Sequence, residues 1–204
     1  YSRDSEAPSP DLEKIRAMTG TTSNAPDDTW LFTGGAITQG VGQSGTVRNY
    51  IGHFEEAVRW EQATVNSSGS EYRRQRFMIN GGREGQTVID LNNNFSTLIE
   101  PFKAKAVSVM VGLEDSAAGA SGIEDFKTNL SSLIDKIRAS GAVPVLQMQN
   151  AITDQTKIHD LELYIDTALD VASDKDAVVV NHYKNWKDRE AQDPGYISEH
   201  LNGD

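Results

Sequence analysis

Three glycine-containing segments directly follow apolar runs of the chain, and they hold the first candidates for chemistry. They are Gly34-Gly35-Ala36, Gly82-Arg83-Glu84-Gly85 and Gly112-Leu113-Glu114-Asp115. An apolar run that ends in glycine predicts a buried strand followed by a tight turn. Chemistry in an open α/β sheet lies just beyond the carboxyl ends of such strands. Ala36 therefore occupies a position where a nucleophile is expected, although its methyl group cannot attack. Glu114 and Asp115 offer two carboxylates but lack the further ligands that a cation site needs, so no metal site is predicted.

Two glycine-rich stretches come close to phosphate-binding motifs, and each fails in one requirement. Gly40 to Gly45 matches G-x-G-x-x-G, but a dinucleotide site needs that motif in the turn directly after a strand. The preceding strand is expected to end near Thr33, so a plain loop is favoured over a cofactor cradle. Residues 35–40 have the glycine spacing of a P-loop, but Val41 stands where the phosphate-binding lysine is required. No cofactor is predicted.

Five apolar runs alternate with segments of helical periodicity. The predicted strands are 29–33, 76–80, 106–111, 143–148 and 177–181. The predicted helices are 11–18, 47–61, 87–99, 123–140 and 157–173. Nearly continuous apolar strands indicate a parallel sheet that is covered on both faces. We therefore predict an α/β protein with a three-layer α/β/α fold and a five-stranded parallel sheet of flavodoxin-like order. Trp60, Phe77 and Met110 are expected in its core. The tail, 182–204, is expected to be irregular, with one helical turn near Trp186.

Composition narrows the class of protein further. The chain has 204 residues, 37% of them hydrophobic and 24% charged, which suits a single globular domain. A net charge of -11 argues against a nucleic-acid partner, because phosphate binding needs clustered Lys and Arg. The absence of cysteine excludes disulfides and thiol catalysis. No apolar run approaches the ~20 residues of a membrane span. The chain starts without Met, so we expect a piece of a longer protein, with an arm and short helix over 1–20 and one α/β domain over 21–204.

The three segments resemble the sequence blocks of the SGNH (GDSL-type) hydrolases, a family of esterases and acylhydrolases. The first family block is G-D-S-I-T-x-G, and this chain has Gly34-Gly35-Ala36-Ile37-Thr38-Gln39-Gly40. The second supplies a glycine after strand two, matched by residues 80–87, and the third is G-x-N-D, matched by residues 112–115. Segments such as 53–61 also resemble bacterial members. The likeness extends over nearly the whole chain from Trp30 and implies an SGNH-hydrolase-like fold.

The resemblance also implies a role for each position. In the family, the first-block serine is the nucleophile, so Ala36 occupies the nucleophile position. An oxyanion hole is formed by that residue's N–H, by the second-block glycine, here Gly82, and by the third-block asparagine, replaced here by Glu114. A late D-x-x-H supplies the carboxylate and the base of the triad. Asp204 matches the aspartate if the domain is truncated before its histidine, whereas His200 is the alternative base and lacks an aspartate three residues before it.

These departures leave three hypotheses for function. The first is an SGNH-type esterase for short acyl or carbohydrate O-acetyl esters, in a form without its serine. The second is a natural pseudoenzyme that serves as a ligand-binding or interaction module. The third is a different hydrolytic chemistry in which Glu114 acts as general base for water, for which the sequence reveals no group to polarise the carbonyl. The expected partner is a small ester or glycan, and a secreted or extracytoplasmic bacterial location is expected.

Overall fold

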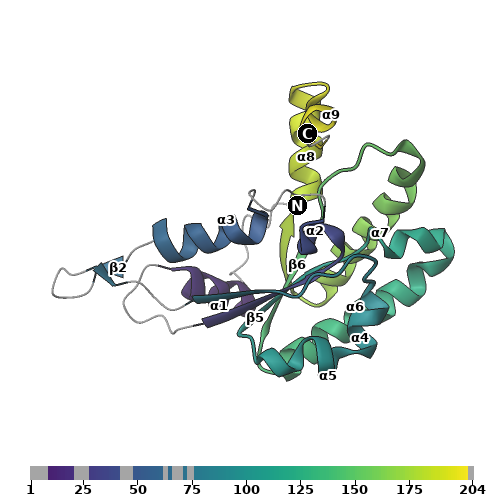
Figure 1. Cartoon of the computed structure of the whole chain (residues 1–204). Coiled ribbons are helices and arrows are strands. Elements are labelled where there is room, and N and C mark those ends of the chain that lie inside the picture. Colours follow the sequence, from purple (N-terminus) through teal and green to yellow (C-terminus); the bar gives the residue numbers. More distant parts are fainter. Residues whose placement is uncertain are drawn as a thin grey trace.

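A central parallel sheet with helices on both faces forms the body of the protein (Figure 1). The computed structural model describes residues 9–20, 28–41, 48–61, 64–65, 71–72 and 76–201. The strands of the main sheet are β1 (Asp28–Gly34), β4 (Arg76–Asn80), β5 (Ala106–Met110), β6 (Val143–Met148) and β7 (Val178–Asn181). Their order is β4-β1-β5-β6-β7, and every neighbouring pair is parallel. This is the flavodoxin-like order predicted from the sequence, which is thereby confirmed. A separate antiparallel pair joins β2 (Thr64–Val65) to β3 (Glu71–Tyr72).

The helices form the two outer layers. The longer helical segments are α1 (Pro10–Thr19), α3 (Tyr50–Glu56), α4 (Val88–Asn93), α6 (Ile123–Ala139), α7 (Gln155–Asp174) and α8 (His182–Gln192). The shorter ones are α2 (Ala36–Gln39), η1 (Ala57–Glu61), α5 (Phe95–Leu98), η2 (Glu100–Phe102), η3 (Asp115–Gly122) and α9 (Tyr196–Leu201). Helices α4, α6 and α7 cover one face of the sheet, and α1 and α3 cover the other. Among the described residues, no helix is long and apolar enough to cross a membrane.

The alternation of side chains along each strand divides the core into two clusters. Trp30 and Phe32 of β1 lie on the α3 side, where their ring centroids are 5.0 and 5.6 Å from that of Phe54. Leu31 lies between them in sequence, is fully buried, and faces the cluster formed by α4, α6 and α7. Burying one such side chain stabilises the fold by roughly 1.5–3 kcal/mol. Because β1 is buried on both faces, its carboxyl end is held firmly at the centre of the sheet.

Several predictions of local structure are wrong. The expected irregular tail forms two helices, α8 and α9, which extend away from the sheet in Figure 1. The first begins at a capping residue, Asn181, whose side chain accepts a hydrogen bond from Lys184 N at 2.9 Å, and it carries an ion pair between Lys184 and Asp188. The second is capped by Glu190, whose carboxylate accepts hydrogen bonds from two backbone N–H groups. The capping residues Asn181 and Glu190 were present in the sequence, but the polar composition of the tail led to the prediction of irregular structure.

Two predicted helices are interrupted, and one predicted core residue is exposed. The segment 47–61 contains α3 followed by a π-helical turn, and 87–99 contains α4 and α5 as separate helices. Phe77 is 51% exposed because β4 is an edge strand, whereas Met110 is buried as predicted. The side chain of Trp60 lies outside the described residues.

The N-terminal helix α1 packs on the sheet beside β6 and contributes Met18 to the core. Its buried Asp11 accepts two hydrogen bonds from Arg138 of α6, at 2.9 and 2.8 Å. The predicted boundary at residue 20 is untested and stays a prediction.

Candidate functional site

A small cavity lies where β1 and β5 end side by side at the centre of the sheet. It is lined by residues 35–37 after β1 and 110–114 at the end of β5, together with Gln86 and Gln149. Its volume is about 10 Å³, which is the room that one water molecule needs. The chain leaves β1 and returns on both sides of it, as β4 and as β5, so the cavity lies at the topological switch point of the sheet. Open α/β sheets bind their ligands at this point.

Ala36 is the first residue of α2, the short helix that follows β1. Its side chain is half-buried and lines the cavity. The helix is tied to α3 by a hydrogen bond of 3.3 Å between Thr38 Oγ1 and the hydroxyl of Tyr50. Burial raises the pKa of Tyr50 to about 12, and the bond to Thr38 offsets only part of that rise. The protein therefore fixes the position of residue 36 but offers only a methyl group there.

Gly82 follows β4 and packs directly against α2. A Cβ at this position would lie 2.4 Å from the backbone nitrogen of Gln39, so only glycine fits. The adjacent Arg83 N–H donates to Gly34 O at 2.8 Å, which joins this loop to the end of β1. The N–H of Gly82 itself donates to Asn80 Oδ1 at 2.9 Å. The predicted oxyanion donor is thus brought beside the first block, with its N–H already engaged by a side chain.

Glu114 shares the small cavity with Ala36, and its side chain lies against Gly35. A Cβ added to Gly35 would be 3.2 Å from Glu114 Cγ and 3.3 Å from its Oε1, closer than ordinary contact. The carboxylate of Glu114 therefore occupies space that a side chain at position 35 would otherwise need.

Asp115 holds two of the loops together. Its carboxylate accepts hydrogen bonds from Val88 N at 2.8 Å and from Gly112 N at 2.9 Å, so it links the start of α4 to the end of β5. Burial raises the pKa of Asp115, and the hydrogen bonds from the two backbone N–H groups lower it only in part. The carboxylate of Asp115 thus satisfies one of the free N–H groups at the start of α4.

Gln86 and Gln149, which no sequence motif singled out, also line the cavity. Both side chains are more than nine-tenths buried. Gln86 Oε1 and Gln149 Nε2 have no hydrogen-bond partner among the described residues. A buried amide without a partner is unfavourable unless a ligand or ordered water completes it. The only signal in the sequence was the placement of each glutamine just after a predicted strand or glycine loop.

The residues predicted as the carboxylate and the base of a triad, Asp204 and His200, are not among the described residues that line this cavity. His200 is exposed on α9, where its Nδ1 lies 2.9 Å from Tyr196 O and its ring stacks on Tyr196. Asp204 lies outside the described residues. His182 follows β7, and its Nε2 is 3.3 Å from Oε1 of Gln147 on β6. Burial lowers the pKa of His182 and so favours the neutral ring.

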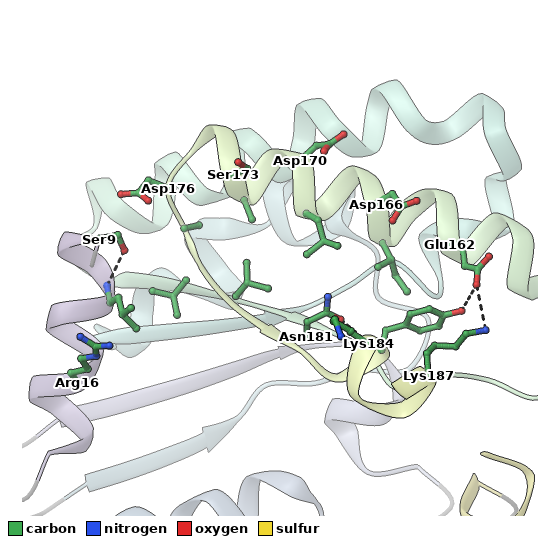
Figure 2. A pocket seen from close by; sticks show the side chains of 18 residues that line it. Ser9, Arg16, Glu162, Asp166, Asp170, Ser173, Asp176, Asn181, Lys184 and Lys187 are labelled. Carbon is green, nitrogen blue, oxygen red and sulfur yellow. Dashed lines mark hydrogen bonds and ion pairs between the residues drawn. The ribbon is translucent and has the colours of Figure 1, made fainter. Parts of the chain in front are cut away.

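A much larger cavity lies elsewhere, along the edge of β7. This β7 groove has a volume of about 1000 Å³ and is bounded by α1, β7, the outer side of α7 and the first turns of α8 (Figure 2). It contains none of the residues that the family blocks single out. The small cavity is the better candidate for acyl chemistry, because the block residues and the unpartnered amides meet there.

Comparisons with known proteins identify the family of this chain and structures that share its fold. The family model of the GDSL-like lipases and acylhydrolases matches residues 32–204, and the chain therefore belongs to this family. No curated protein matches the chain.

Solved structures of low sequence identity share its fold. One is an acetylxylan esterase from Geobacillus stearothermophilus, Axe2, in a form carrying a catalytic substitution. It is 16% identical, with a TM-score of 0.63 and 81% of each chain covered. Another is LAE5, an alpha/beta hydrolase enzyme from the metagenome of Lake Arreo in Spain. It is 18% identical, with a TM-score of 0.62 and 82% of each chain covered.

Proposed function

We propose that this chain is an SGNH-type acylhydrolase domain whose small cavity receives the acyl group of a short ester, such as an O-acetylated carbohydrate, and which lacks a serine nucleophile at position 36. The observation that carries the proposal is the meeting of Ala36 and Glu114 in one cavity at the switch point. The structural neighbour Axe2 is an acetylxylan esterase, which supports the substrate class. Room for about one water molecule argues against a long acyl chain in this cavity.

The chemistry of the site follows from its side chains. Ala36 has no atom that can form an acyl-enzyme, so the covalent route of the family is blocked. A carboxylate at position 114 would oppose a developing oxyanion. Removing one oxyanion donor alone costs about 10²–10³ in rate, even without repulsion. Ligand binding without rapid turnover is therefore the expected behaviour of the chain.

A second candidate function is that of a natural pseudoenzyme, and the packing of Gly35 against Glu114 favours it. The family block has aspartate at position 35, whereas this chain has glycine, and the space is taken by the side chain of Glu114. Gly35 and Glu114 both differ from the family blocks, and the small residue leaves room for the large one. Such a matched pair of changes is not expected if Ala36 is an artificial replacement of the serine alone. In this case the cavity serves recognition only.

The test measures hydrolysis of p-nitrophenyl acetate by the protein extended past Asp204, so that a histidine after that position is included. It compares the unmodified protein with Ala36→Ser and with Ala36→Ser combined with Glu114→Asn. Ala120→Ser is the matched control, because Ala120 is exposed and lies outside the cavity. The first proposal expects at least tenfold more activity in one of the serine variants at position 36 than in the control. Activity equal to the control in both variants would favour the pseudoenzyme.

Turnover by the unmodified chain would contradict both candidates. It would instead favour Glu114 as a general base for water, with the unpartnered Gln149 Nε2 as the donor that polarises the carbonyl. Gln149→Leu would then reduce kcat.

A further inference from the structure

The β7 groove exposes an edge strand that has a pairing partner on one side only. In the described part of the chain, β7 pairs with β6, and no strand lies against its outer side. Val179 and Val180 are each 36% exposed, which is high for valine in a strand of this kind of sheet. Apolar side chains from both outer layers, including Leu12 of α1 and Leu169 of α7, line the groove beside β7. A free strand edge between apolar walls is a template for an added strand.

The α7 side of the groove is acidic. Glu162, Asp166 and Asp170 follow one another along this helix at four-residue intervals and form a row (Figure 2). Glu162 is engaged by the hydroxyl of Tyr183 at 2.6 Å and by Lys187 at 3.8 Å. Asp166 and Asp170 have no ion-pair partner among the described residues.

The basic side chains at the groove do not offset this charge. Arg16 pairs with Glu13 at 2.9 Å, and Lys184 pairs with Asp188 at 2.5 Å. The α7 side of the groove therefore keeps a net negative charge, which a cationic occupant would complement.

Pairing with a second copy of the chain is disfavoured by the same charges. Two β7 strands that pair in antiparallel fashion are related by a two-fold axis perpendicular to the sheet. Such an axis keeps α7 of both copies on the same face and brings the two rows of carboxylates together. Like charges across an interface select against that arrangement.

We propose that the β7 groove binds an extended segment of a basic partner protein, which adds to the sheet beside β7 and places Lys or Arg side chains against Asp166 and Asp170. Four helical residues separate these carboxylates by about 6 Å along α7. Alternate side chains of an extended strand are about 6.6 Å apart and point to the same face. Basic residues at every second position of the segment thus match the row, and the intervening apolar residues point toward Leu12 on the other face.

The test uses a fluorescein-labelled heptapeptide of alternating valine and lysine, titrated with the protein and followed by fluorescence anisotropy. The expected result is saturable binding that weakens at least tenfold in the variant Asp166→Asn with Asp170→Asn. The matched control is Asp174→Asn, since Asp174 is exposed on the same helix but does not line the groove. This control should bind as the natural chain does. Circular dichroism shows whether each variant remains folded.

Two further peptides separate strand addition from simple charge attraction. A peptide of alternating valine and glutamate should not bind, and the lysine peptide with N-methyl groups on alternate residues should bind at least tenfold more weakly, because it cannot complete the ladder. The proposal is overturned if the lysine peptide does not bind, if the double variant binds it unchanged, or if N-methylation has no effect. It is also overturned if the chain is a dimer in sedimentation experiments and Val179→Lys makes it monomeric.

Discussion

The small cavity and the β7 groove differ in size by about two orders of magnitude, at about 10 and 1000 Å³. The smaller one holds residues of the family blocks. The small cavity is lined by loops that follow the central strands, and two buried amides in its wall have polar atoms with no partner in the part of the chain that the structure describes. The β7 groove is a wide channel beside an edge strand, with an apolar lining and a charged rim. Position in the sheet, more than volume, separates a candidate for acyl chemistry from a candidate for docking.

The structural cause of this difference is the pairing of the strands. β1 has a neighbour on each side, so the loops after β4, β1 and β5 are drawn together by backbone hydrogen bonds such as that from Arg83 N to Gly34 O. Side chains in these loops then meet within a few ångströms. Within the described ranges, β7 has a neighbouring strand on one side only, so its outer edge meets the walls of two different layers and leaves room between them.

The largest expected effect comes from overfilling the close contact between Gly82 and α2, beside the small cavity. Gly82→Val would place a Cβ within 2.4 Å of Gln39 N and force the second loop away from α2. We expect a loss of about 3 kcal/mol in the free energy of unfolding, at the upper end for overpacked sites. Urea denaturation measures it. Arg83→Ala in the same loop is the control and should change stability by less than about 0.5 kcal/mol. If Gly82→Val is as stable as the natural chain, the close packing of the first two blocks is wrong.

A smaller loss is expected at the wall of the β7 groove. Arg138→Met removes both hydrogen bonds to Asp11, whose side chain is only 8% exposed. Arg138 is 32% exposed, so we expect about 2 kcal/mol, below the 3–5 kcal/mol for a fully buried pair that loses one partner.

Lys175→Met is the control for Arg138→Met, because Asp135, the partner of Lys175, is 59% exposed and stays solvated without the pair, which should contribute under about 1 kcal/mol. Thermal unfolding compares the two variants. Equal losses would mean that α1 is not anchored through Asp11, and the groove would lose a fixed wall.

The sequence predicted the centre of the molecule better than its edges. The ends of β1 and β5 were placed within one residue, because a strand buried on both faces is a continuous apolar run that ends in glycine. That placement also brought Ala36, Gly82 and Glu114 into one neighbourhood. The roles assigned to these residues remain predictions.

Besides the two interrupted helices, the errors concern the exposure of side chains on edge strands and the structure of the tail. Phe77 on β4 and Val179 on β7 belong to apolar runs like those at the centre, yet both are exposed, because a run of residues does not reveal which side of a strand lacks a neighbour. The β7 groove could not be predicted for the same reason. In the tail, the capping residue Asn181 was the available signal for α8, but the polar composition outweighed it.

The smallest expected effect is a change in pH dependence at His182, which follows β7 and lies beside Gln147 of β6. Burial lowers the pKa of His182 in the folded state, so the unfolded chain binds the proton more strongly. The stabilisation from the neutral ring is present above the ordinary pKa of 6.5 and is lost as the pH falls toward the lowered folded value. His182→Gln should therefore lose less stability than the natural chain when the pH falls from 7 to 5. Urea midpoints of the two proteins at pH 5, 7 and 8 measure the difference. At pH 8 the ring is neutral in both the folded and the unfolded chain, so any difference there comes from the substitution itself and not from protonation. Parallel curves for the two proteins would show that His182 does not link the ends of β6 and β7 through its neutral form.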